Sequence, residues 1–144
     1  MLRANGRSTR GACYRGVAAM VIGIGLDLVE TERVVRLLER YGERFVRKLM
    51  DPGEADALPE AGPDRARRLA LAVAGKEAAS KALGTGWSHG VRWRDVVVVT
   101  GPETTVRLAG RAAEVASERG SSGRTRVRFE IAGEHAIGEV WLLS

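Results

Sequence analysis

The pattern of apolar and polar residues divides the first half of the chain into one strand and a series of helices. Residues 21–28 form an apolar run that ends in acids, which is typical of a buried strand. Between residues 30 and 50 the apolar residues recur every three or four positions, and this spacing predicts a long amphipathic helix bent at Gly42. Residues 65–83 are rich in Ala, Leu and Arg and predict a central helix that ends at Gly84.

The second half of the chain has mainly strand-like patterns. Within residues 91–100, the run Val96–Val99 is entirely β-branched and predicts a strand buried on both faces. Further elements are a short helix over 54–58, strands over 104–108, 124–131 and 136–143, and a helix over 110–119. The last two strands are close enough in sequence to form a hairpin. The resulting order is β-α-α-α-β-β-α-β-β, which predicts an α+β fold.

Length and composition predict a single folded domain. The chain has 144 residues, of which 44% are hydrophobic and 28% are charged. Cys13 is the single cysteine, and His89 and His135 are the two histidines, so the sequence excludes an internal disulfide and a structural zinc site. A reducing, cytoplasmic location is therefore expected.

The net charge of +5 is concentrated near the N-terminus. Residues 1–19 contain four arginines and no acid, which leaves 19 basic and 18 acidic residues in 20–144. We interpret residues 1–19 as an irregular basic extension and residues 20–144 as the domain, with Met20 as a candidate translation start. The arginines lack the density and aromatic interleaving of a nucleic-acid-binding surface, and the apolar run 17–26 is too short to span a membrane. Neither nucleic acid nor a membrane is expected as a partner.

Three places in the sequence carry candidate chemistry. Asp27 lies at the end of an apolar strand, where an ionised carboxylate is costly unless it is paired, hydrogen-bonded or bound to a metal ion. Alternatively, Asp27 caps the N-terminus of the helix that follows. Glu77 precedes Lys81 by one helical turn, the spacing of a surface ion pair, although its small neighbours would also admit a bulky anionic ligand. The sequence Gly84-Thr85-Gly86 is most simply a helix C-cap.

Arginines recur at helical spacing along the predicted helix over residues 30–50. The stripe consists of Arg33, Arg36, Arg40, Arg44 and Arg47. It is either a docking surface for an acidic partner or a solvated helix face, and spacing alone does not separate these alternatives.

Taken together, these segments resemble the holo-acyl-carrier-protein synthase family of 4′-phosphopantetheinyl transferases. The resemblance extends over residues 21–99 and rests on Gly23-Ile24-Gly25-Leu26-Asp27, Lys76-Glu77-Ala78 and Lys81-Ala82-Leu83-Gly84-Thr85-Gly86. It implies an antiparallel sheet packed on a long central helix. It also implies Mg²⁺-dependent transfer of phosphopantetheine from coenzyme A to a serine of an apo acyl carrier protein, with release of 3′,5′-ADP. The family's usual assembly is a homotrimer with each site at a subunit boundary.

The resemblance also assigns roles to residues. Asp27 and Glu77 match the family's metal-binding acids, and Lys81 completes the expected catalytic set by steadying charge on the β-phosphate. The candidates for holding coenzyme A are Lys76, Lys81, Gly84, Thr85 and Gly86. Arg33 matches the carrier-contact arginine of the family, with Arg36 and Arg40 as neighbours.

The chain departs from the family pattern near its end. Residues 128–131 read Arg-Phe-Glu-Ile where the family has a Ser-x-Ser/Thr-His motif, and residues 103–105 replace a Gly-Lys-Pro turn. An alternative function is therefore a carrier-protein-binding module that has kept the fold and lost the transferase activity. A third candidate function is that of a metal-dependent enzyme that acts on another phosphopantetheine or nucleotide substrate.

Overall fold

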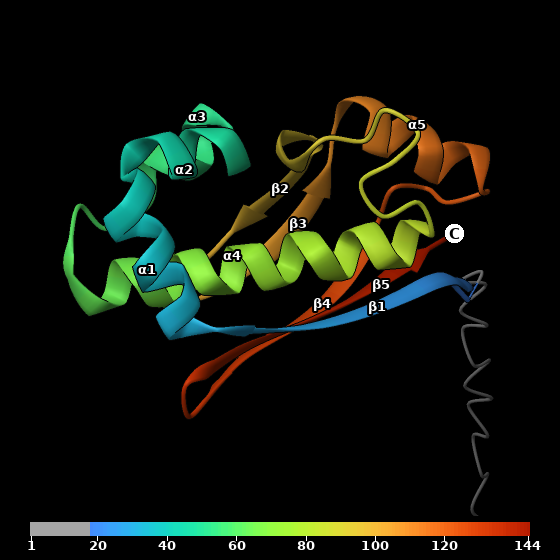
Figure 1. Ribbon diagram of the computed structural model, residues 1–144. Coiled ribbons are helices and arrows are strands. Elements are labelled where there is room, and N and C mark those ends of the chain that lie inside the picture. Colours follow the sequence, from blue (N-terminus) through green and yellow to red (C-terminus); the bar gives the residue numbers. More distant parts are fainter. Residues whose placement is uncertain (1–17) are drawn as a thin grey trace, which may run out of the picture.

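The computed structural model describes residues 18–144 and confirms the α+β class (Figure 1). In chain order the elements are β1 (Val21–Glu30), α1 (Thr31–Tyr41), α2 (Glu43–Leu49), α3 (Pro52–Asp56), α4 (Gly62–Leu83), the 3₁₀ helix η1 (Trp93–Asp95), β2 (Val96–Val99), β3 (Thr105–Leu108), α5 (Gly110–Glu118), β4 (Thr125–Ala132) and β5 (His135–Leu143). No helix within these residues is long and apolar enough to cross a membrane. The basic extension predicted over 1–19 lies outside the described residues except for Ala18 and Ala19.

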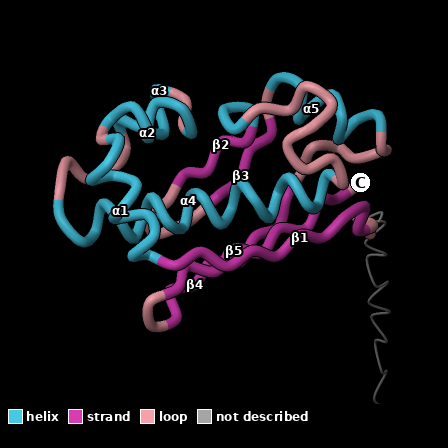
Figure 2. The backbone as a smooth tube through the Cα atoms, in the orientation of Figure 1, coloured by secondary structure: helices cyan, strands magenta, loops and turns pink. Residues whose placement is uncertain are grey.

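Two antiparallel sheets lie on opposite sides of helix α4. The larger sheet has the strand order β1-β5-β4, and β2 and β3 pair as a separate ladder. Figure 2 shows α4 running between the two sheets, with α1, α2 and α3 gathered near its N-terminal half. The predicted hairpin is present, because β4 and β5 pair from Thr125 opposite Leu142 to Ala132 opposite His135. The resemblance implied one sheet, whereas the structure has two. A side-chain hydrogen bond links them, in which Thr125 Oγ1 on β4 donates to the Val106 carbonyl on β3 at 2.7 Å.

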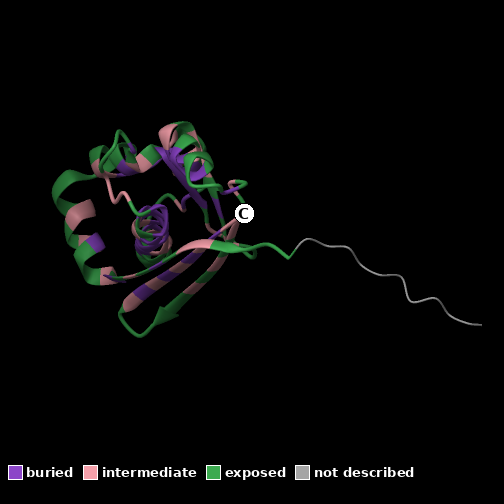
Figure 3. Cartoon of the chain, turned by 90° about the vertical axis from the view of Figure 1, so that its right-hand side faces the viewer, coloured by how far each residue is buried: buried purple, intermediate pink, exposed green. Residues whose placement is uncertain are grey.

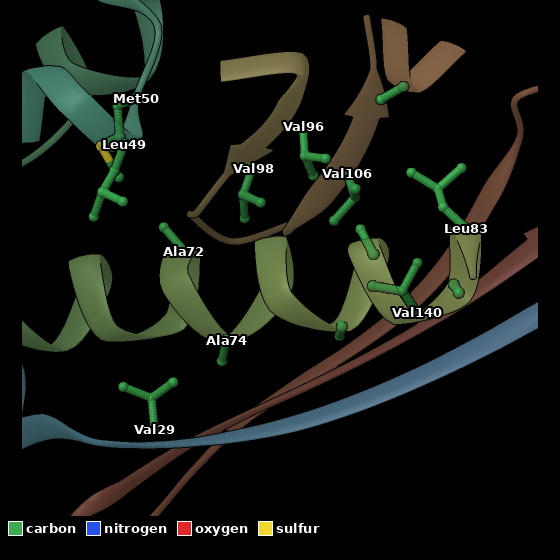
Figure 4. Close-up of a cluster of buried hydrophobic side chains, with 14 of the residues drawn as sticks. Val29, Leu49, Met50, Ala72, Ala74, Leu83, Val96, Val98, Val106 and Val140 are labelled. Carbon is green, nitrogen blue, oxygen red and sulfur yellow. The ribbon is translucent and has the colours of Figure 1, made fainter. Parts of the chain in front are cut away.

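Helix α4 is buried along most of its length. Figure 3, which looks along this helix, shows it enclosed in the centre of the molecule. A helix that is enclosed on all sides needs apolar or small residues around its whole circumference, and α4 supplies mainly alanines. Figure 4 shows Ala72 pointing from α4 toward Val98 and Ala74 pointing toward the opposite layer. The core therefore has two layers, which share α4 as their centre.

Glycines allow β1 and β5 to approach the backbone of α4 very closely. A Cβ atom added at Gly25 would lie 1.8 Å from the Ala78 carbonyl oxygen, and one added at Gly23 would lie 2.0 Å from that of Ala82. At Gly138 on β5 the added atom would lie 2.9 Å from the Ala74 carbonyl oxygen. Main chain therefore packs directly on main chain along this contact.

The structure differs from three details of the prediction. The long helix over 30–50 is two helices, because Gly42 adopts φ 54° and ψ −139° and its N–H closes α1 on the Leu38 carbonyl. Residues 93–95 form η1 instead of part of a strand. Val96, Val97 and Val98 are buried as predicted, but Val99 is 46% exposed.

On the side of the larger sheet that points away from α4, strand β1 carries a row of aliphatic side chains that is uncovered within residues 18–144. On β1, Ile24, Leu26 and Leu28 alternate with residues that face α4. These three side chains are 57%, 58% and 56% exposed. A row of half-exposed aliphatic residues is unusual for a surface that faces only water.

Candidate active site

Asp27 lies on β1 opposite Gly138 and meets the C-terminal half of α4. Its Oδ1 accepts a hydrogen bond from Lys81 Nζ at 2.7 Å, and Lys81 Nζ also donates to the Leu26 carbonyl at 3.1 Å. The Asp27 side chain is 20% exposed and that of Lys81 is 52% exposed. The capping alternative for Asp27 is wrong, because the N-cap residue of α1 is Glu30 and its side chain makes no capping hydrogen bond.

Glu77 lies on α4 one turn before Lys81, but the two do not form the helical ion pair that the spacing suggested. Within residues 18–144, the only hydrogen bond to the Glu77 carboxylate comes from the indole Nε1–H of Trp87, which donates to Oε2 at 3.1 Å. Lys81 binds Asp27 instead. The ion-pair interpretation is therefore wrong, and both carboxylates keep one oxygen that accepts no hydrogen bond from the described residues.

Asp27, Glu77 and Lys81 line one cavity of about 430 Å³. Its other walls include Arg33 and Val34 from α1, Phe45 from α2 and Trp93 from η1. Because β1 packs directly against α4, residues far apart in sequence meet here at one place. The site combines two carboxylates, one ammonium group and one guanidinium group over an apolar floor.

The two carboxylates fit Mg²⁺ by the chemistry of their donor atoms. Mg²⁺ prefers hard oxygen ligands and is usually held by one or two carboxylates together with water and phosphate oxygens. No group of three or more His, Cys, Asp or Glu side chains suited to a metal ion occurs in the part of the chain that the structure describes. The protein therefore offers two carboxylates and leaves the remaining positions to other oxygen donors.

Lys76 has a structural position, and the prediction that it holds coenzyme A is wrong. Its side chain is completely buried, and Nζ lies 2.8 Å from Glu54 Oε1. Nζ also donates to the Trp93 carbonyl at 3.1 Å and to the Val96 carbonyl. Burial lowers the pKa of Lys76, and the attraction of Glu54 opposes this shift. All three Nζ protons have protein acceptors, so none is left for a ligand.

The Gly84-Thr85-Gly86 turn ends α4. Gly84 has φ 74°, and its N–H donates to the Lys81 carbonyl, which confirms the C-cap interpretation. Gly84 and Thr85 line a second cavity of about 340 Å³ together with His89, Arg111 and Arg119, rather than the cavity of Asp27 and Glu77. In this chain the Gly84-Thr85-Gly86 turn therefore does not line the same cavity as the Asp27 and Glu77 carboxylates.

The arginine stripe is divided by the break at Gly42. Arg33, Arg36 and Arg40 lie on α1, whereas Arg44 and Arg47 lie on α2. Arg36 binds Glu32 at 2.7 Å, and the Arg40 guanidinium lies 5.2 Å from the centroid of the Tyr41 ring. Arg33 is the member of the stripe that reaches the cavity.

Two tryptophans belong to the site although the sequence analysis gave them no role. The rings of Trp87 and Trp93 are stacked, with centroids 4.1 Å apart and planes inclined by 19°. Trp93 lines the cavity, and Trp87 donates to Glu77. The available signal was the tryptophan immediately after Gly84-Thr85-Gly86, but the contact depends on a loop conformation that no spacing rule predicts.

Comparison with known proteins places the fold and the sequence in one family. The model of the 4′-phosphopantetheinyl transferase superfamily matches residues 23–138. The holo-[acyl-carrier-protein] synthase of Solibacter usitatus is 44% identical over 104 residues, which is 70% of this chain and 82% of the relative. The crystal structure of the holo-[acyl-carrier-protein] synthase from Neisseria meningitidis matches with a TM-score of 0.75 and 27% identity, over 85% of this chain and 98% of that one. That of the Bacillus anthracis synthase, in complex with CoA (3′,5′-ADP), matches with a TM-score of 0.70 and 25% identity, over 88% and 99%. This chain therefore belongs to the 4′-phosphopantetheinyl transferase superfamily.

Proposed function

We propose that this protein transfers the 4′-phosphopantetheine group of coenzyme A to a serine of an apo acyl carrier protein. The observation that carries the proposal is the meeting of Asp27, Glu77 and Lys81 at one cavity, from β1 and α4. The names of the matched relatives support the reaction, and one solved relative is a complex with CoA.

In this reaction the serine oxygen forms a bond to the β-phosphorus of coenzyme A. The bond from that phosphorus to the bridging oxygen breaks, 3′,5′-ADP leaves with this oxygen and the electron pair of the bond, and the serine hydroxyl releases its proton to water. Asp27 and Glu77 would hold Mg²⁺, which when bound neutralises the pyrophosphate. Lys81 places an ammonium group at the same cavity and is half exposed, so it can steady negative charge on the phosphate as the bond breaks.

The carrier protein would approach along α1. Arg33 lines the cavity and is exposed, so a partner that contacts it also lies near the carboxylates. Arg36 and Arg40 are exposed on the same helix. Opposite charge on a carrier helix would speed the encounter and orient the carrier serine toward the cavity.

We further propose that copies of this chain cover the aliphatic row of β1 on the outer side of the larger sheet, in a homotrimer. Ile24, Leu26 and Leu28 form a row of more than half-exposed aliphatic side chains on β1. Burial of such a row against an identical surface stabilises an assembly by roughly 25 cal/mol per Å² of apolar area. Because Asp27 lies between Leu26 and Leu28, this assembly would place the active site close to a subunit boundary.

One experiment tests the transferase function directly. The protein is mixed with Mg²⁺, coenzyme A and an apo acyl carrier protein, and the mass of the carrier protein is measured by mass spectrometry. Addition of one phosphopantetheine group, absent when Mg²⁺ is chelated, supports the proposal. An unmodified carrier that nevertheless binds the protein favours the alternative of a carrier-binding module without transferase activity.

A further inference from the structure

We propose that Trp87 is a positioning residue, which holds the Glu77 carboxylate in the orientation needed to bind the metal ion. This inference rests on the proposed role of Glu77. Trp87 follows Glu77 by ten residues, in the loop after α4, and its indole Nε1–H donates to Glu77 Oε2 at 3.1 Å. The other carboxylate oxygen, Oε1, accepts no hydrogen bond from residues 18–144. A hydrogen bond to one oxygen of a charged carboxylate restricts its rotation and leaves the second oxygen for a ligand.

The loop that carries Trp87 is fixed by its own hydrogen bonds. The Gly86 N–H donates to the Ser80 carbonyl at 3.2 Å, and the Ser88 N–H donates to the Thr85 carbonyl at 3.3 Å. Gly86 has φ 56°, a left-handed conformation that favours glycine. The backbone on both sides of Trp87 is therefore tied to α4 or to the preceding turn, so the position of the indole follows from that of the helix.

Trp93 fixes the plane of the indole. Its ring stacks on that of Trp87 with a centroid separation of 4.1 Å. The Trp93 carbonyl in turn accepts a hydrogen bond from Lys76 Nζ at 3.1 Å. Lys76 precedes Glu77 in α4 and is completely buried against Glu54. These contacts form a closed ring, in which Lys76 holds Trp93, Trp93 stacks on Trp87, and Trp87 holds Glu77.

This arrangement explains two features that the transfer chemistry alone leaves without a role. The Lys76 side chain is completely buried and does not face the cavity, yet it holds the backbone of Trp93, which lines the cavity. Trp93 lines the cavity, and the Trp87 indole stacked on it orients one of the two carboxylates of the site. Metal affinity should therefore depend on a residue that does not itself touch the metal ion, as is common for groups behind metal ligands.

A spectroscopic experiment tests the contact without requiring activity. In ¹⁵N-labelled protein the three tryptophans give three indole N–H signals, which Trp87→Phe and Trp141→Phe assign by removing one signal each. Glu77→Gln should displace the Trp87 signal, because the acceptor loses its charge, and should leave that of Trp141 unchanged. A Trp87 signal that stays in place in Glu77→Gln overturns the proposal.

A kinetic experiment tests the consequence. Trp87→Phe keeps a ring that can stack on Trp93 and removes the N–H donor, whereas Trp87→Leu removes both. For Trp87→Phe we expect the half-saturating Mg²⁺ concentration to rise about ten- to a hundredfold, as is typical for the loss of a group behind a metal ligand. Turnover at saturating Mg²⁺ and the melting temperature should stay close to those of the wild type. Trp87→Leu should raise the Mg²⁺ requirement further.

The outcomes separate this inference from the proposed function. An unchanged Mg²⁺ requirement in Trp87→Phe overturns the positioning role while leaving the transferase function intact. A lower melting temperature together with reduced turnover at every Mg²⁺ concentration indicates a purely structural role for Trp87. This result also overturns the positioning role. If the wild-type protein transfers nothing, the proposed function fails, and the indole signal in Glu77→Gln still decides whether Trp87 holds Glu77.

Discussion

Lys81 on helix α4 reaches across 54 residues of sequence to Asp27 on strand β1, with Nζ and Oδ1 2.7 Å apart. The same lysine lies one turn after Glu77, with which it shares a cavity but not an ion pair. The ammonium group therefore sits beside the carboxylate of the strand and not beside that of its own helix. This relationship joins the two sequence motifs into one site.

The first prediction concerns the two carboxylates. Asp27→Asn and Glu77→Gln should each abolish Mg²⁺-dependent turnover, because an amide is a much weaker Mg²⁺ ligand than a carboxylate. The Asp27 ion pair involves a half-exposed lysine, so its loss should lower the free energy of unfolding by no more than about 1 kcal/mol. Turnover is measured at limiting Mg²⁺, and folding by thermal denaturation.

Glu114→Gln is the matched control for these variants. Glu114 is an acid on α5 that is 66% exposed and paired with Arg111, so the substitution should change neither turnover nor folding. Near-wild-type turnover of Asp27→Asn or Glu77→Gln at limiting Mg²⁺ would show that the substituted residue is not a metal ligand.

The second prediction concerns Arg33. Arg33→Glu should weaken carrier binding by about 1–3 kcal/mol, because it removes an attraction and adds repulsion from the acidic carrier. The melting temperature should hardly change, since exposed charges contribute little to stability. Titration calorimetry with apo carrier at increasing salt measures the effect. Arg107→Glu, an exposed arginine on β3, is the control, and equal affinities of the two variants would contradict a docking role for α1.

The third prediction concerns the buried pair of Lys76 and Glu54. Lys76→Met should lower the free energy of unfolding by about 3–5 kcal/mol, because it leaves the Glu54 carboxylate buried without its cation. The double variant Lys76→Met/Glu54→Gln should recover part of this loss, since no charge is then buried. Urea denaturation measures both, with the exposed Lys48→Met as control. No recovery in the double variant would refute the pairing argument.

The same pair predicts a pH dependence of stability. Burial lowers the pKa of Lys76 from its ordinary value of 10.5, so between the lowered pKa and 10.5 the unfolded state binds more protons than the folded state. The contribution of Lys76 to the free energy of unfolding should therefore rise with pH through this window and be constant below it. Lys76→Met should lack this rise. Urea denaturation of both proteins from neutral pH upward gives the comparison.

The fourth prediction concerns the uncovered face of the larger sheet. Leu26→Glu should reduce the assembly to monomers, because it places a charge in the centre of the proposed contact between copies. Light scattering during size-exclusion chromatography reports the mass. Val99→Glu changes a comparably exposed aliphatic residue on β2 and should leave the mass unchanged. A wild-type protein that already elutes as a monomer would refute the proposed assembly.

The fifth prediction concerns the N-terminus. A chain that begins at Met20 should be as stable and as active as the full chain. The Met20 N–H donates to Ser144 Oγ at 2.9 Å, and the Ser144 N–H donates to the Met20 carbonyl, so the shortened chain keeps the contacts that tie β1 to the C-terminus. Melting temperature and turnover of the two proteins test this, and a marked fall in either would assign residues 1–19 a role in the fold or the site.

Local patterns were sufficient to predict most elements of the fold. The hairpin of β4 and β5 and the central helix follow from periodicity and helix propensity, because those features depend on neighbouring residues. The break at Gly42 was underestimated, since Tyr41 and Phe45 continue the apolar spacing through a glycine whose dihedral angles leave the helical region. Periodicity describes which positions are apolar but does not describe backbone angles.

The site was predictable only where a motif indicated it. Asp27, Glu77 and Lys81 line one cavity, as the resemblance implied. The role of Lys76 was not predictable, because its partner Glu54 is 22 residues away in sequence and its burial depends on how α3 and β2 pack on α4. Trp87 was missed for the same reason, since its contact with Glu77 requires the folded loop.

The glycine contacts between β1 and α4 bear on how far this chain can diverge. Gly23 and Gly25 place the strand against the helix through main-chain atoms, so the separation of Asp27 from Glu77 and Lys81 depends little on the identity of other side chains. Sequence change at residues 103–105 and 128–131 can therefore alter the surroundings of a substrate while the geometry of the carboxylates persists. Evolution of new carrier or substrate preferences in such a scaffold does not require the metal-binding residues to be rebuilt.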